Sequence, residues 1–267
     1  MPSQPVRMEM FGETNVGMKR THNEDNYAII PDENLVIVAD GMGGHASGEV
    51  ASKMAVDALK EFFEATAKDP DATWPYKMDK ARSYEENRLV TGVKLANLRI
   101  FEQAQREPRF RGMGTTIVVI AAVREGLIIG HVGDSRVYRI REGKIEQMTE
   151  DHSLLNDYLK MRKLTEEEIA NFPHKNVIVR ALGMKEVVKV DARVEQPQRN
   201  DIFLLCSDGL SGPVNDPELL RIVEESKDDL KTAASRLIAK ANENGGPDNI
   251  TCCLVRWLGE PGQPFRS

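Results

Sequence analysis

The sequence predicts an α+β protein in which two antiparallel β-sheets pack face to face between pairs of helices, an α-β-β-α sandwich. Three observations lead to this fold class. The predicted strands are nearly continuous apolar runs, which is typical of sheets covered on both faces. Several of these runs follow one another at hairpin spacing, which favours antiparallel pairing. The helical segments each carry a single apolar stripe, so we expect them on the outsides of the sheets.

The predicted strands are short and rich in Ile and Val. They span residues 35–39, 116–123, 127–132, 137–141, 202–206 and 250–255. Gly126 and Gly143 each follow a Glu between two consecutive strands. Glycine adopts the positive φ that a tight hairpin turn requires, so these positions indicate turns.

Three helices are predicted because apolar residues recur three and four positions apart over residues 51–63, 89–105 and 230–241. Polar residues dominate two other stretches, 66–88 and about 153–175. Strong elements flank both, so neither is expected to be a domain linker. We therefore expect one domain over residues 1–267.

Composition restricts the possible classes of function. The chain has 267 residues, and its net charge is −6, so it should not attract nucleic acid or anionic membranes. Its N-terminus does not resemble a signal peptide and no apolar run is long enough to span a bilayer. The three cysteines lie in or beside apolar runs without metal-ligand spacing, which predicts buried thiols and a reducing cytoplasmic location.

Carboxylates occur at the ends of several predicted strands. Asp40 and Asp208 each follow an apolar run and precede a glycine, and Asp134 also follows one. Asp248 and Glu24 each lie just before an apolar run. A single Asp-Gly pair is usually a turn signal. Several acids that converge in a buried place would repel one another unless a cation lay among them, and oxygen ligands favour Mg²⁺ or Mn²⁺.

A pair of such cations is suited to phosphoryl transfer to water, because it neutralises charge on the attacking and leaving oxygens. Arg20, four residues before Glu24, could bind a phosphate through two guanidinium nitrogens. The alternative interpretation of Arg20 is an ordinary surface residue. The bare pattern thus favours a metal-dependent phosphoryl hydrolase.

Eight motifs, in this order, resemble the bacterial branch of the metal-dependent type 2C Ser/Thr protein phosphatases. They extend over nearly the whole chain, and the series is far more specific than any one of them. The motifs are Arg20-Thr-His-Asn-Glu-Asp-Asn26, Val38-Ala-Asp-Gly-Met-Gly-Gly-His45, Gly112-Met-Gly-Thr-Thr116, Gly133-Asp-Ser-Arg136, Thr149-Glu-Asp-His152, Arg180-Ala-Leu-Gly183, Cys206-Ser-Asp-Gly-Leu210 and Gly246-Pro-Asp-Asn-Ile-Thr251.

The resemblance implies a role for each matched residue. Asp40 would bridge two Mn²⁺ or Mg²⁺ ions. Glu24 and the Gly41 carbonyl would bind one ion, and Asp208 and Asp248 the other. A weaker third ion would be held by Asp134 with Asp208. Asp25 would hold metal-bound water, Asn249 would support the ligands from behind, and Arg20 would bind the substrate phosphate. Residues from about 153 to 176 would form a mobile flap subdomain.

One position departs from the better-known eukaryotic pattern of the family. Those members carry His directly after the Asp-Gly, as a proposed general acid, whereas this sequence has Met42 there. His45 follows three residues later and is one hypothesis for the proton donor; the alternative is that His45 only begins a helix and that metal-bound water is the donor. The scattered His22, His131, His152 and His174 lack metal-ligand spacing, so we interpret them as structural.

The function implied by the resemblance is hydrolysis of phosphoserine and phosphothreonine in proteins, by in-line attack of hydroxide that the metals activate. The expected partners are phosphorylated proteins, including a separate Ser/Thr kinase that the enzyme counteracts, and we expect a monomer. No cysteine lies in a phosphate-binding Cys-x₅-Arg loop, which disfavours a covalent phosphoenzyme. Three alternatives remain: an inactive phosphoprotein-binding relative, a hydrolase of nucleotides or other phosphoesters, and a phosphatase specific for anti-sigma antagonist proteins.

Overall fold

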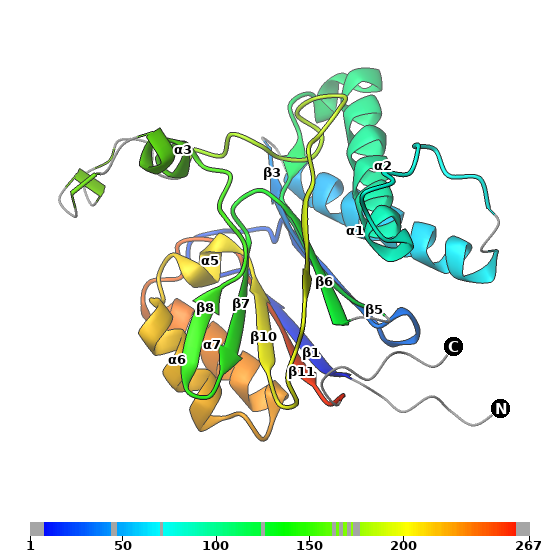
Figure 1. Cartoon of the computed structure of the whole chain (residues 1–267). Coiled ribbons are helices and arrows are strands. Elements are labelled where there is room, and N and C mark those ends of the chain that lie inside the picture. Colours follow the sequence, from blue (N-terminus) through cyan, green and yellow to red (C-terminus); the bar gives the residue numbers. More distant parts are fainter. Residues whose placement is uncertain are drawn as a thin grey trace.

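The computed structural model describes residues 8–43, 47–69, 72–123, 126–161, 164–165, 168–169, 172 and 177–259. The protein has four layers: two antiparallel sheets face each other, and helices cover the outer face of each (Figure 1). The fold class predicted from the sequence is therefore confirmed.

Each sheet is built from antiparallel neighbours. The first has the order β1 (Met8–Asn15), β11 (Ile250–Trp257), β10 (Ile202–Cys206), β7 (Arg136–Arg141) and β8 (Lys144–Gln147). The second has the order β2 (Asp25–Ile30), β3 (Leu35–Met42), β5 (Ile117–Val123), β6 (Gly126–Val132) and β9 (Asp191–Glu195), and β4 (Gly114–Thr115) pairs with the end of β3.

Two helix pairs cover the sheets. The helices α1 (Ser47–Lys68) and α2 (Tyr84–Arg106) pack on the second sheet, while α6 (Asp216–Glu225) and α7 (Leu230–Glu243) pack on the first. Shorter elements join them: η1 (Pro31–Glu33), η2 (Pro108–Phe110), α3 (Leu154–Met161) and α5 (Asp208–Ser211). Each long helix has one apolar stripe because only one of its faces meets a sheet.

The core has three apolar layers, which explains why the strands are apolar along their whole length. On β3, Ile37 and Ala39 face the helices, whereas Val36 and Val38 face the other sheet. Side chains of a strand alternate between its faces, so a strand buried on both faces shows no polar alternation. Each buried Val or Ile contributes about 1.5–3 kcal/mol of hydrophobic stabilisation.

Local signals in the sequence set several boundaries. Glu142 and Gly143 both have positive φ, 49° and 70°, in the two-residue turn between β7 and β8. That conformation matches the twist of the strands, so the predicted turn is confirmed. At the start of α2, Ser83 and Glu86 form a reciprocal capping box. These bonds satisfy backbone donors that the first helical turn leaves without a partner.

The sequence did not predict β1, β9 or α6, which are too polar or too short to show a clear period. The polar stretch 66–88 is partly helical at both ends, since α1 continues to Lys68 and α2 begins at Tyr84. Between them Trp74 packs against Phe62 and Tyr84, with ring centroids 5.8 and 4.9 Å away. This segment is thus fixed to the outer helix layer.

The structure describes part of the expected flap at about 153–176. It begins with α3, which projects from the body of the molecule (Figure 1), and a β-bridge between Ser153 and Ile178 joins its two ends. Several residues between them lie outside the described ones, so the flap stays a prediction. No helix in the described ranges is long and apolar enough to cross a membrane.

Candidate metal centre

Five of the predicted carboxylates meet where the two sheets end. Asp25, the first residue of β2, pairs with Asp40 near the end of β3. Asp208 follows β10 by two residues and Asp248 precedes β11 by two, and the Ser207 amide bonds to the Thr251 carbonyl between those strands. The loop after β6 carries Asp134. Segments distant in the sequence thus supply one acidic cluster.

The carboxylates raise one another's pKa. Burial, followed by repulsion from Asp25, Asp208, Asp134 and Asp248, raises the pKa of Asp40 well above its ordinary value. Burial raises the pKa of Asp25 to about 6 and, with repulsion from Asp208, that of Asp134 to about 7. Burial and the nearby Asp248 also raise the pKa of Asp208. The cluster therefore lacks the positive charge that would balance its carboxylates.

Two oxygens of the cluster have no hydrogen-bond donor. Oδ1 of Asp25 and Oδ1 of Asp134 are buried and unpartnered within the described part of the chain. Native proteins rarely leave a buried carboxylate oxygen without a partner, because its desolvation is costly. Several oxygen ligands without a soft donor are the set that Mg²⁺ and Mn²⁺ prefer. The residues present therefore fit a divalent metal centre.

The Glu24 loop is held against β3 and α1 by backbone contacts. The Gly41 amide donates to the Glu24 carbonyl at 3.1 Å, and the Gly48 amide donates to Oε1 of Glu24 at 3.2 Å. Ser52 donates its hydroxyl to the same carbonyl at 2.6 Å. A Cβ on Gly41 would lie 2.1 Å from the Gly48 carbonyl oxygen, so only glycine allows this approach.

Asn249 joins the Glu24 loop to the first sheet. Its Oδ1 accepts from the Glu24 amide at 2.8 Å, and its Nδ2 donates to the carbonyls of Val16 and His22 at 2.9 and 2.8 Å. Ser207 connects the sheets in a similar way, because its hydroxyl donates to Oδ2 of Asp25 at 2.7 Å. The sequence predicted a supporting role for Asn249 but none for Ser207, although Ser207 belongs to the motif Cys206-Ser-Asp-Gly-Leu210.

Arg20 lies at the rim of the cluster. Its Nη2 donates to Oδ2 of Asp248 at 2.8 Å, and the guanidinium is half exposed. That hydrogen bond and the charge of Asp248, with smaller contributions from Glu24 and Asp40, raise the pKa of Arg20. Arg20 is therefore a fixed positive charge beside the carboxylates and open to solvent.

A cleft of about 570 Å³ opens beside Asp134, Asp208 and Asp248. Its wall includes Arg136, which donates to both carboxylate oxygens of Asp151 at 2.7–3.1 Å. Both residues belong to motifs of the family resemblance, Gly-Asp-Ser-Arg and Thr-Glu-Asp-His, but no role was predicted for either of them. Their occurrence in two motifs was the available signal. Residues at the base of the expected flap, such as Leu155, also line this cleft.

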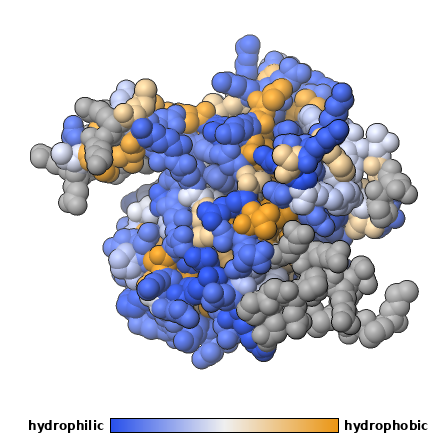
Figure 2. Space-filling view, in the orientation of Figure 1, coloured by the Kyte–Doolittle hydropathy of each residue, from blue (hydrophilic) through white to orange (hydrophobic). Residues whose placement is uncertain are grey.

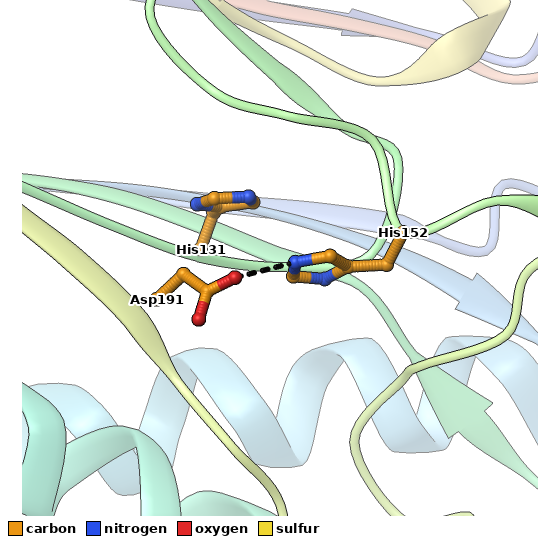
Figure 3. A group of neighbouring side chains, drawn as sticks. All are labelled: His131, His152 and Asp191. Carbon is orange, nitrogen blue, oxygen red and sulfur yellow. Dashed lines mark hydrogen bonds and ion pairs between the residues drawn. The ribbon is translucent and has the colours of Figure 1, made fainter. Parts of the chain in front are cut away.

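The histidines do not join this cluster in the described part of the chain. His131 and His152 lie together beside Asp191, as Figure 3 shows, which agrees with a structural role. His45, the hypothetical proton donor, and His174 lie outside the described residues. The three cysteines are free and buried, as predicted.

The acidic cluster at one end of a four-layer sandwich fits the class of metal-dependent phosphatases. Residues 18–258 match the model of the protein phosphatase 2C family, so the chain belongs to this family. It is 39% identical over 249 residues to the serine/threonine phosphatase stp of Listeria welshimeri, covering 91% of this chain and 93% of that one. It is 37% identical over 251 residues to the phosphatase PhpP of Streptococcus pneumoniae, covering 93% and 97%.

Solved structures give the same assignment. The Mycobacterium tuberculosis serine/threonine phosphatase PstP/Ppp superposes with a TM-score of 0.82 at 32% identity, covering 95% of this chain and all of that one. The catalytic domain of PstP in complex with two manganese ions gives a TM-score of 0.77 at 33% identity, covering 95% and 99%. The chain is therefore a metal-dependent protein serine/threonine phosphatase.

Proposed function

We propose that the carboxylate cluster holds two divalent cations, Mn²⁺ or Mg²⁺, and that these residues carry out the phosphatase reaction. The observation that carries this proposal is the buried, mutually repelling set around Asp40, with raised pKa values and unpartnered oxygens. Asp40 would serve both ions, Glu24 and the Gly41 carbonyl would serve one of them, and Asp208 and Asp248 the other. Asp134 and Asp208 would hold a weaker third ion.

The bound cations would neutralise charge on the phosphate and favour deprotonation of the attacking water. Arg20 binds the substrate phosphate through its guanidinium, which the pair with Asp248 already holds at the rim of the cluster. Asp25, anchored by Ser207, accepts a hydrogen bond from water at its free Oδ1. Asn249 holds the Glu24 loop beside the start of β11 through its side-chain hydrogen bonds.

The attacking group is water and not a cysteine. Burial raises the pKa of Cys206 to about 12 and also raises those of Cys252 and Cys253, so these thiols are not available as thiolates. The donor of the leaving-group proton is either metal-bound water or His45. A His45→Ala enzyme with unchanged rate and pH profile on a phosphothreonine peptide would exclude His45.

The proposal is tested by phosphate release from a phosphothreonine peptide. Activity should require Mn²⁺ or Mg²⁺, disappear with a chelator, and fall sharply in Asp208→Asn. The matched control is Asp228→Asn, an exposed aspartate in the turn between α6 and α7, which should keep wild-type activity. Full activity in the chelator would contradict the metal proposal, and equal rates in Asp208→Asn and the control would contradict the ligand assignment.

The substrates proposed are proteins phosphorylated by a separate Ser/Thr kinase, and the kinase itself is one of them. The enzyme acts as a monomer in the cytoplasm, without binding nucleic acid or membranes, in accordance with its net charge of −6. A panel of nucleotides against phosphopeptides separates this proposal from a nucleotide hydrolase. Residues 153–176 act as a flap over the cleft that Leu155 lines.

A further inference from the structure

A second pocket, of about 350 Å³, shares no lining residue with the cleft beside Asp134, Asp208 and Asp248. It is formed by α3 and by the segment that leads from the expected flap to β9. Its lining includes the cations Lys160, Arg180, Lys185 and Lys189, the acid Asp157, and the apolar residues Val179, Ala181, Met184, Val187 and Val188. None of the proposed metal ligands or phosphate-binding residues lines this pocket.

The pocket is positively charged although the chain as a whole carries −6. Lys160 pairs with Glu150 at 3.0 Å, but Arg180 and Lys189 share the single carboxylate of Asp191, at 2.9 and 3.5 Å. Lys185 is exposed and has no ion pair with any residue that the structure describes. Positive charge therefore remains for an incoming anion.

Apolar side chains surround these cations. Met184 and Val187 are 51% and 77% exposed, and Val179 also reaches the surface. On the neighbouring α3, Tyr158 and Met161 are exposed as well, and hydrophobic side chains gather on this projecting part of the surface (Figure 2). Basic groups interspersed with exposed apolar groups suit a peptide better than a free inorganic anion.

The floor of the pocket is rigid. Gly133 donates its amide to Nδ1 of His152 at 3.0 Å, and Nε2 of His152 bonds to Oδ2 of Asp191 at 2.9 Å (Figure 3). With His131 these groups could bind a cation, but Nη1 of Arg180 already lies 2.9 Å from both His152 Nε2 and Asp191 Oδ2. Its Nε and Nη2 have no partner in the described part of the chain and can bind an anion.

Short connections join this pocket to the metal centre. Leu182, next to the lining residue Ala181, exchanges two backbone hydrogen bonds with Thr115, whose hydroxyl donates to the Asp40 carbonyl at 2.9 Å. On the other wall, His152 contacts Gly133, the neighbour of Asp134. The cleft and the pocket are also adjacent along the chain, since Asp151 and Ser153 line the cleft and His152, between them, lines the pocket.

We propose that this pocket binds an anionic side chain, a carboxylate or a second phosphate, that lies near the scissile phosphoresidue of the substrate. The inference rests on the proposed function and adds a substrate class to it: phosphoproteins that are acidic or multiply phosphorylated around the target residue, with apolar residues beside the anion. Binding occurs through Lys185, Lys189 and the free nitrogens of Arg180.

The test uses the metal-loaded enzyme and a set of phosphothreonine peptides. One Glu, one non-hydrolysable phosphonate residue or one Gln is placed in turn at each position on both sides of the phosphothreonine. At one position or two adjacent ones, kcat/KM should be about fivefold higher for Glu than for Gln, as expected of an exposed ion pair. The phosphonate should exceed Glu if the pocket prefers phosphate, and high salt should reduce both preferences.

Lys185→Glu should reduce the Glu-over-Gln preference about tenfold and so reverse it, and Lys185→Gln should remove about half of the effect. Lys231→Glu, with the same charge change on the exposed surface of α7, should keep the wild-type preference. Equal kcat/KM for Glu and Gln peptides at all positions, or a preference that survives Lys185→Glu, would overturn the proposal. If no peptide were hydrolysed, the proposed function itself would fail.

Discussion

Two polar clusters in this protein each contain carboxylates, but the surrounding charges shift the pKa values of those carboxylates in opposite directions. At the metal centre, Asp40 and its neighbours have raised pKa values, and two carboxylate oxygens lack partners among the described residues. At the pocket floor, burial alone would raise the pKa of Asp191, but hydrogen bonds from His152 and Arg180 lower it to about 2. Asp191 is therefore paired with cations of the protein itself, whereas the pKa values around Asp40 stay raised because too few cations of the described chain lie beside those carboxylates.

The two clusters differ in role: the carboxylates around Asp40 are proposed to be functional, whereas Asp191 stabilises the fold. Carboxylates that stabilise a fold are paired with the protein's own cations, as Asp191 is with Arg180 and Lys189. Carboxylates that repel one another without such partners destabilise the metal-free fold, and they remain useful only if a ligand brings the missing charge. The two clusters should therefore respond in opposite ways to neutralisation of an acid.

The largest effect is expected for Asp40→Asn. Activity on a phosphothreonine peptide should fall more than about 100-fold, because even the residues that support metal ligands commonly contribute 10–100-fold. In chelator, however, the melting temperature should rise, since the substitution removes buried repulsion. Activity assays and calorimetry in chelator measure the two effects, and a lower melting temperature would contradict the charge imbalance inferred here.

A smaller effect of opposite sign is expected for Asp191→Asn. It leaves Arg180 and Lys189 without their shared carboxylate, so the free energy of unfolding should fall by roughly 1–2 kcal/mol. Urea denaturation with and without Mn²⁺ gives the value. The loss should be similar in both conditions because the ions bind elsewhere, and a loss seen only with Mn²⁺ would disagree with a structural role.

Two further predictions concern the pH dependence of stability. The pKa of Asp134, about 7 against an ordinary 3.8, means that the folded metal-free protein binds this proton more tightly than the unfolded chain. Its contribution is complete below pH 3.8 and is lost as pH rises through 7. Burial, then repulsion from His131, lowers the pKa of His152 to about 4 from 6.5, so its contribution is complete above pH 6.5 and is lost as pH falls through 4.

Difference measurements isolate these two contributions. Denaturation in chelator should show that Asp134→Asn becomes more favourable relative to wild type as pH rises from 4 to 7. His152→Gln should become relatively more favourable as pH falls from 6.5 to 4. Parallel pH profiles for wild type and either variant would show that the corresponding shift is absent.

The sequence predicted the sandwich because both of its signals are local. Strands such as β5 and β10 are continuous apolar runs, and α7 shows one clear stripe. It did not predict β1 or β9, because their partly exposed residues carry no period and pairing with β11 and β6 determines their conformation. Local pattern cannot report pairing between distant segments.

The candidate metal ligands were found for a similar reason. Carboxylates at strand ends are visible in the sequence, and the order of motifs identified the family. The contacts of Ser207 and Arg136 could not be predicted from the sequence. Ser207 contacts Asp25 across 182 positions, and Arg136 meets Asp151 only in the folded chain. The pocket beside Lys185 depends on how α3 and a later segment lie together, so no motif could have indicated it.

The contact between Gly41 and Gly48 has a consequence for reading related sequences. A Cβ on Gly48 would lie 2.7 Å from the Gly41 carbonyl carbon and 2.8 Å from Cδ of Glu24. A single added methyl group at either position would thus separate β3 from α1 and displace Glu24. A related enzyme could therefore lose activity through a substitution at either glycine while every acidic residue stays in place. An intact set of acids does not by itself identify an active phosphatase.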